Sequence, residues 1–265
     1  MDILGLIEWR AILIAALIFI PFEQILPLHA EQKLIRKNWL NDVFYLIFNG
    51  VMIKLLFIAV MIGWMAASDL MVPQSLLAFV QSQPLWLQTI EVILIADVGF
   101  YAAHRTFHAV PWLWKFHSVH HSIEEMDWLA AHRVHPVDQL ITMSASMLPV
   151  YALGFSPMAV MIYAIIYHWQ ALLIHSNVKL DFGPLKWLVA SPQFHHWHHA
   201  NERSAYDKNF AGQLSFIDAI AGTLRMPDRM PIAYGCDDPV PALYHQQLIY
   251  PLLPNPAPQK SKQTA

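Results

Sequence analysis

The chain of 265 residues has few of the side chains that soluble proteins carry in quantity, and each shortage excludes a class of protein. Its one cysteine, Cys236, excludes intrachain disulfides, C-x-x-C redox motifs and thiolate zinc or iron–sulfur sites. Charged residues make up only 13% of the chain, about half the share usual in soluble domains. The net charge of −3 and the pI of about 6.6 provide no basic field for nucleic acid.

Apolar residues are abundant instead. They make up 56% of the chain, whose mean hydropathy of +0.38 is typical of a membrane protein. The stretches long enough to consider as membrane helices are residues 3–21, 43–66, 86–103, 139–153 and 157–175. The fourth is short for a full span, so the last two also fit a shallow hairpin. We therefore expect an all-α, polytopic membrane protein with about four to five transmembrane or hairpin helices.

Basic residues alternate between the stretches. Fourteen of the sixteen Lys and Arg residues lie in residues 22–42, 104–138 and from 176 onward, while residues 67–85 contain none. Because basic loops stay on the cytoplasmic side, this pattern predicts a multi-pass topology with those three segments in the cytoplasm. Both histidine-rich stretches of the chain then form a cap on the cytoplasmic face.

Histidine is the residue present in unusual excess, with 15 copies, eleven of them within residues 104–135 and 195–199. The spacing of these residues is i, i+4 in one case and i, i+3, i+4 in two cases, so each set projects from one side of a helix. The sets are His104 and His108; His117, His120 and His121; and His195, His198 and His199. Neutral imidazole is a common ligand of transition metals, and eight imidazoles suffice to enclose two ions. A single histidine on an apolar face is usually structural, but three matching sets are not explained in that way.

Other residues are assigned by their position relative to these sets. His135 and His175, at the inner ends of two apolar stretches, are favoured as further ligands, while His29 and His245 stand alone. The remaining histidines are expected to surround the ligands: His132, His168 and His196. Asp97 and Tyr101 share the helix face of His104. Asp97 would either accept an imidazole N–H or pair with Arg105 or Arg133, and Tyr101 would supply a hydrogen bond near the metals.

The motifs HRTFH, HSVHH, HRVHP, HSN and HHWHH together resemble the fatty acid hydroxylase/sterol desaturase superfamily of integral membrane oxygenases, from about residue 90 to 225. The resemblance implies a non-haem di-iron centre with ten ligands: His104, His108, His117, His120, His121, His135, His175, His195, His198 and His199. Asn209, in a segment that resembles the region after the third box, is assigned to the surroundings of the metals. We accordingly divide the chain into an N-terminal transmembrane region (1–85), a catalytic hydroxylase domain (86–250) and a disordered tail (251–265).

The resemblance further implies an oxidoreductase that uses two iron ions and O2 to hydroxylate or desaturate a C–H bond of a lipid, such as an acyl chain or a sterol. Zinc can replace iron in purified protein, because zinc also binds imidazole. The lipid would reach the site laterally between the third, fourth and fifth apolar stretches. Since no nucleotide fingerprint, haem motif or cysteine cluster is present, electrons must come from a separate ferredoxin, cytochrome or reductase.

Two other classes use similar residues. A di-zinc membrane hydrolase binds its metals through the same nitrogen ligands and employs a glutamate as base. A divalent-metal transporter needs polar groups near the membrane midplane, whereas these histidines gather at the ends of the apolar stretches. The acidic residues after the second box, Glu124, Glu125 and Asp127, are expected to form a solvated turn.

Overall fold

The computed structural model describes residues 9–68 and 72–254. Within them the chain is helical, with isolated β-bridges in place of strands, which confirms the all-α expectation. The α-helices are α1 (Trp9–Ile25), α2 (Trp39–Phe44), α3 (Gly50–Ser68), α4 (Gln74–Ser82), α5 (Leu85–Ala109), α6 (Pro111–His121), α7 (Pro136–Ala152), α8 (Pro157–His175), α9 (Pro192–His198), α10 (Ser215–Ala221) and α11 (Tyr244–Ile249). The π-helical residues Tyr45–Asn49 join α2 to α3, and the 3-10 helix η3 spans Trp128–His132.

Three helical segments of the described residues are long and apolar enough to cross a membrane: Trp39–Trp64, Leu85–Ala109 and Pro157–His175. Large apolar side chains on their outer faces are exposed, as contact with lipid hydrocarbon requires. Helices α1 and α7 have 17 residues each and are shorter than these spans. Residues 3–8 of the first expected span lie outside the described residues, as do residues 255–265 of the expected tail, whereas Pro251 is buried.

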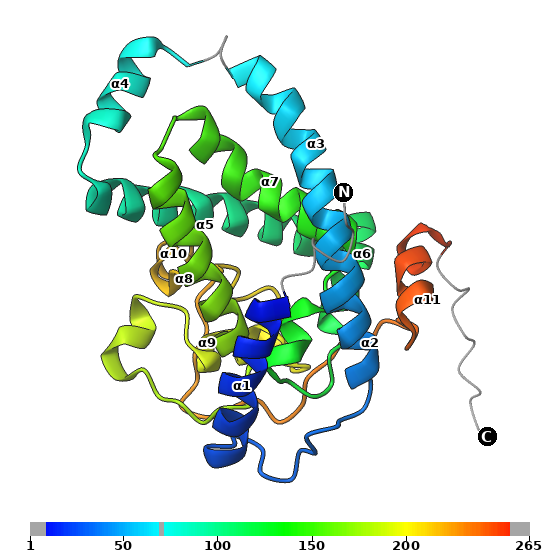
Figure 1. Cartoon of the computed structure of the whole chain (residues 1–265). Coiled ribbons are helices and arrows are strands. Elements are labelled where there is room, and N and C mark those ends of the chain that lie inside the picture. The colour runs from blue at the N-terminus through cyan, green and yellow to red at the C-terminus, as the bar shows by residue number, and fades with distance from the viewer. Residues whose placement is uncertain (1–8, 69–71, 255–265) are drawn as a thin grey trace, which may run out of the picture.

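Helices α5, α7 and α8 pack together and support the site (Figure 1). Gly99 permits the close approach of α5 to α7, because a Cβ atom there would collide with the backbone of Ala145. The α7–α8 turn forms where the sequence predicts a break. Gly154 there has a φ of 70°, and the Ser156 hydroxyl accepts the N–H of Ala159 to cap α8.

A buried ionic network ties the loop before α2 to the loop after α6. The Arg36 guanidinium donates to both carboxylate oxygens of Asp127 and, at 2.6 Å, to Asp42. Arg133 also donates to Asp42. The expectation of a solvated turn is therefore wrong for Asp127, which is buried because it neutralises Arg36. Glu124 does remain exposed, where it pairs with a surface lysine.

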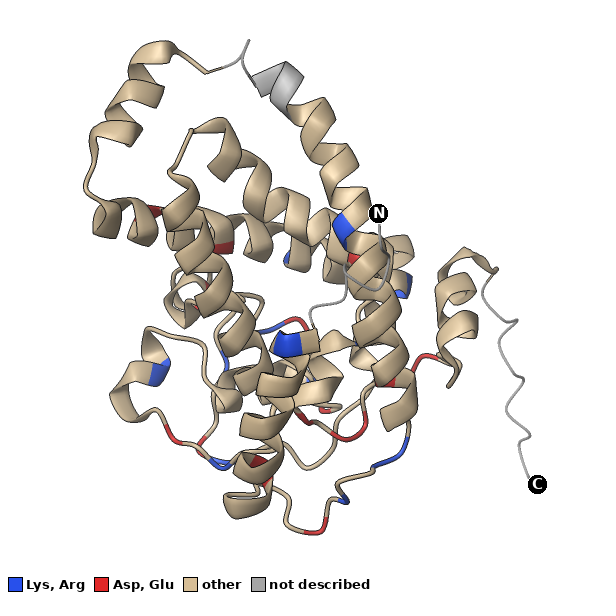
Figure 2. Cartoon of the chain, in the orientation of Figure 1, with Lys and Arg blue, Asp and Glu red and all other residues tan. Residues whose placement is uncertain are grey.

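Charged residues are concentrated in one half of the molecule. Figure 2 shows most Lys, Arg, Asp and Glu residues in the loops around α9 and α2, and few near α4 and the α7–α8 turn. We call the charged half, formed by the loops around α9 and α2, the polar cap, and the other half the apolar region. The histidine motifs lie at the ends of α5, α6, α8 and α9 that face the polar cap.

Candidate metal centre

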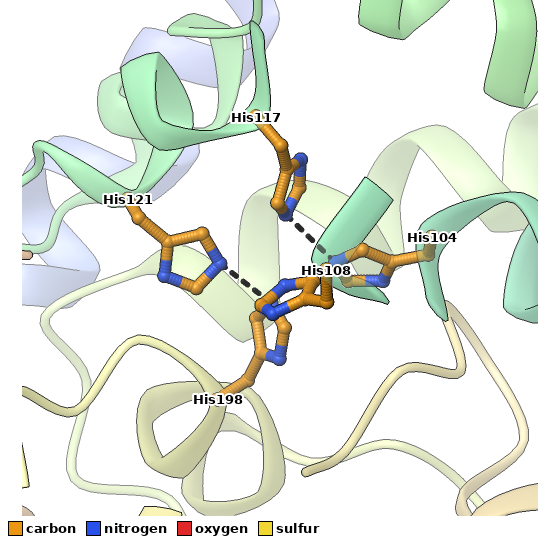
Figure 3. A group of neighbouring side chains, drawn as sticks. All are labelled: His104, His108, His117, His121 and His198. Carbon is orange, nitrogen blue, oxygen red and sulfur yellow. Dashed lines mark hydrogen bonds between the residues drawn. The ribbon is translucent and has the colours of Figure 1, made fainter. Parts of the chain in front are cut away.

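Nine imidazoles meet in two groups at the junction of the polar cap and the apolar helices. In each group, one nitrogen per residue lies within 4.8 Å of those of the other members. The outer group has five members: His104 and His108 from α5, His117 and His121 from α6, and His198 from α9 (Figure 3). The inner group has four members: His120, His175, His195 and His199.

Local sequence explains how these side chains converge. Helix α5 continues to Ala109, six residues beyond the apolar stretch expected from the sequence, so its last two turns present His104 and His108. Pro111 starts α6 directly after α5, which turns the chain sharply. Pro192 starts α9, where the Ser191 hydroxyl accepts the N–H of Phe194.

Each i, i+3, i+4 set divides between the two groups. His117 and His121 join the outer group, whereas His120 between them joins the inner one. Similarly, His195 belongs to the inner group and His198 to the outer one. Each of the two histidine triplets therefore contributes to both groups. The sequence analysis expected each triplet to project from one side of a helix and did not predict this split.

The distances between nitrogens fit shared metal ions. The separations are 2.9 Å for His104 Nε2 and His117 Nε2, and 3.0 Å for His121 Nε2 and His198 Nε2 in the outer group. In the inner group, His175 Nε2 lies 2.8 Å from His195 Nε2. Two nitrogens that each lie about 2.0–2.1 Å from one ion are roughly 3 Å apart. The Nε2 atom of His108 is buried without a hydrogen-bond partner, as a ligand atom would be.

In five of the nine imidazoles, the other ring nitrogen holds the ring in place. Four Nδ1 atoms lie 2.7–2.9 Å from backbone carbonyls, those of His104, His120, His175 and His198. His117 Nδ1 donates instead to the buried carboxylate of Asp138 at 2.7 Å. A proton held on Nδ1 leaves the Nε2 lone pair directed at the group centre, as metal ligation requires.

Burial keeps the imidazoles neutral. Desolvation lowers the pKa of His117, His121 and His198 well below the usual value, and neighbouring imidazoles lower it further. In the inner group, burial lowers the pKa of His120 to about 3. Neutral imidazole is the form that binds metal, so all of these side chains are ready to act as ligands.

His135 lies outside both groups. Its Nδ1 accepts the N–H of Val137 at the start of α7, and its Nε2 donates to the carbonyl of Leu248 at 3.2 Å. With both nitrogens engaged, it has no lone pair to offer a metal. The structure therefore brings together nine of the ten expected ligands.

The side chains expected around the ligands have varied positions. Asp97 accepts the N–H groups of Gly212, Gln213 and Leu214, so its carboxylate orders a loop and contacts neither an imidazole nor an arginine. Tyr101 bonds to Thr223 and Arg105. Asn209 donates to the carbonyls of Phe194 and Arg225. These residues fix the segment that carries the carbonyls of Lys208 and Phe210, and so act on His198 and His104 through the backbone.

The three additional histidines differ in their surroundings. His196 is fully buried and bonds to the Tyr234 hydroxyl at 2.8 Å and to the Ser176 carbonyl. His132 and His168 line a cavity that also borders five of the grouped imidazoles. Sequence spacing missed Asp138, because its partner His117 is 21 residues away on another helix.

Comparisons with known proteins point to one family. The fatty acid hydroxylase family model matches residues 89–223. The chain is 32% identical over 147 residues to the ornithine lipid hydroxylase OlsE of Rhizobium tropici, covering 55% of this chain and 44% of OlsE. It is 33% identical over 153 residues to human alkylglycerol monooxygenase (54% and 32% covered), and 28% identical over 141 residues to human cholesterol 25-hydroxylase (50% and 49%).

The matched region covers less than half the length of these relatives. No solved structure matches the chain. The names of the relatives describe hydroxylases and monooxygenases that act on lipids, so the hydrolase and transporter alternatives are not favoured. The family match spans all of the grouped histidines and confirms the resemblance drawn from the histidine motifs. The chain belongs to the fatty acid hydroxylase family.

Proposed function

We propose that the protein is a membrane-bound, O2-dependent di-iron oxygenase that hydroxylates or desaturates a C–H bond of a lipid. The observation that carries the proposal is the double group of nine imidazoles, eight buried and His108 half-buried, beside a cavity that borders the apolar helices. When bound, two irons would supply the activation of O2 for attack on a C–H bond. The nine grouped histidines would hold them, five around one ion and four around the other.

The substrate would react in a cavity of ≈ 180 Å³ between α5, α7 and α8. Its walls combine His104, His120 and His175 with apolar residues such as Phe100 and Leu172. This wall composition keeps bulk water away from the ligands and fits a hydrocarbon chain. The cavity lies beside the helices that contain the third, fourth and fifth apolar stretches, between which the sequence analysis expects the lipid to arrive.

A groove between α1, α3 and α8 supports a different entry from the bilayer than the one expected from the sequence. This groove of ≈ 160 Å³ is lined by Ile12, Gly50 and Trp128, and it shares His132 and His168 with the cavity. A lipid chain entering between these helices would pass the two histidines before it reaches the metals. His132 and His168 would thus position the chain.

Location and electron supply complete the proposal. The basic loops support a cytoplasmic position for the polar cap, and the metal centre lies at the inner side of that cap. A ferredoxin, cytochrome or reductase would deliver electrons there, because the chain contains no redox motif beyond the histidine groups.

Isotope labelling tests this function. Cells that express the chain are compared with cells that lack it by lipid mass spectrometry, and the affected lipid is given to iron-loaded protein with an electron donor under 18O2. We expect a hydroxylated product that carries label from O2, or a product that has lost two hydrogens only when O2 is present. Turnover under nitrogen would overturn the proposal and indicate a hydrolase. So would a product that carries no label under 18O2 but takes up label from H2(18)O in a parallel reaction.

A further inference from the structure

A second cavity, which shares no lining residue with the first, also borders the metal centre. It has a volume of ≈ 360 Å³, and its floor is formed by three imidazoles of the outer group, His108, His121 and His198. Three carboxylates also line it: Asp207, Asp237 and Asp238. We call this cavity the acidic vestibule. None of the residues that line it in the described structure is a lysine or an arginine.

His108 connects the carboxylates to the outer group. Its side chain is only 7% exposed, while that of Asp207, whose Oδ1 lies 3.4 Å from His108 Nδ1, is 73% exposed. The Nε2 atom of His108 is buried without a hydrogen-bond partner. A solvated carboxylate thus contacts an imidazole whose other nitrogen is available to a cation.

The chemistry of this arrangement favours divalent cations. Carboxylates at the mouth of a low-dielectric cavity raise the local concentration of cations and their rate of association. Oxygen ligands bind such ions loosely, whereas a group of imidazoles binds iron or zinc tightly. The inner group has no member on the walls of the vestibule, so an ion arriving there meets the outer group first.

We propose that the acidic vestibule is the inlet through which divalent metal ions load the centre, with Asp207 as the residue that passes each ion to His108. This inference rests on the proposed function only in requiring that the two groups bind metal. It concerns the rate of metal uptake, which needs neither lipid nor O2 and is therefore measured separately from catalysis.

The test follows Co²⁺ uptake by metal-free, full-length protein in detergent, using absorbance in stopped flow and metal analysis at the end point. Asp207→Asn is tolerated by the backbone, because asparagine readily adopts the left-handed φ of 56° at this position. Asp237→Asn is a second variant that changes a carboxylate of the acidic vestibule. Asp228→Asn removes the same charge from an exposed position that is not part of the vestibule wall.

We expect Asp207→Asn to slow uptake about tenfold and Asp237→Asn about threefold at low salt, consistent with electrostatic steering. Asp228→Asn should match the wild type, and all four proteins should reach the same final metal content. High salt should reduce the differences, because it screens the carboxylates. Equal rates of metal uptake by Asp207→Asn and Asp228→Asn would overturn the proposal that the vestibule is the inlet. Reduced final content at an unchanged rate would also overturn it and show that the carboxylates only stabilise bound metal.

Discussion

The outer and inner imidazole groups differ in what surrounds them, although the same two histidine triplets contribute to both. Outer-group members His108, His121 and His198 line a vestibule with carboxylates. Inner-group members His120, His175 and His195 line a cavity beside the apolar helices, which the outer group reaches only through His104 and His117. Under the two proposals above, ions would reach the centre from the polar side and lipid from the membrane side.

Ligand removal should have the largest effect and tests whether each group holds its own ion. His121→Ala in the outer group and His199→Ala in the inner group should each lower metal content by about half and activity by more than about 100-fold. Removing a residue that only hydrogen-bonds to a ligand costs about 10–100-fold, and removing the ligand itself should cost more. Metal analysis and product formation measure both effects.

His135→Ala and His245→Ala are the matched controls, because neither residue belongs to a group. Both should retain their metal. Loss of metal from His135→Ala would return that residue to the ligand set and contradict the nine-ligand centre.

Asp138→Asn should have the next largest effect. The carboxylate of Asp138 accepts the Nδ1 proton of His117, and asparagine keeps an acceptor oxygen but removes the charge. We expect metal affinity to fall about 10-fold, in the range usual for such partners, with helix content unchanged by circular dichroism. Asp181→Asn, which changes an exposed loop carboxylate, is the control. Unchanged metal affinity in Asp138→Asn would show that the position of the His117 ring, and not the charge of residue 138, determines metal binding.

Gly50→Leu sharpens the membrane side of the comparison. Gly50 lines the groove between α1 and α3, and a Cβ atom there meets nothing within 4 Å, so a leucine side chain can start into the groove. We expect kcat/KM for the lipid to fall about tenfold at unchanged metal content, the loss expected when a chain is misplaced. Gly63→Leu on the same helix also extends into open space and should leave turnover within about twofold. Equal effects of the two variants would exclude this groove as the lipid route.

Acid tests the neutral state of the imidazoles in both groups through stability rather than activity. Burial lowers the pKa of His120 to about 3 and that of His132 to about 4 in the folded protein, below the unfolded value of about 6.5. The unfolded state therefore binds more protons below pH 6.5, and each such imidazole costs about 1.4 kcal/mol of stability per pH unit. Because the grouped imidazoles respond in the same direction, the Tm of metal-free protein should fall by more than about ten degrees between pH 7.5 and 5.5.

A variant identifies the source of this acid sensitivity. His132→Gln removes one titrating group outside the ligand set, so its Tm should fall less steeply with decreasing pH than that of the wild type. A Tm that rises on acidification would contradict the neutral, buried state of the imidazoles.

Much of the architecture follows from local sequence. The length of an apolar run and the residues that break it are local properties, so α8 begins and ends at the residues expected, Pro157 and His175. Helical spacing also brought His104 and His108 onto one side of α5, because side chains four residues apart project together. The gathering of these imidazoles could therefore be predicted from their spacing.

Contacts between distant segments were decided by the tertiary structure. The sequence gives His135 and His175 similar positions at the ends of apolar stretches, yet only His175 faces the other imidazoles. Asp127 stands among exposed acids in the sequence but is buried against Arg36, which lies 91 residues away. The carbonyls that orient four imidazoles belong to every residue type, so no sequence pattern marks them. Helix periodicity decides which side chains share a face, while the packing of helices far apart in sequence decides what that face meets.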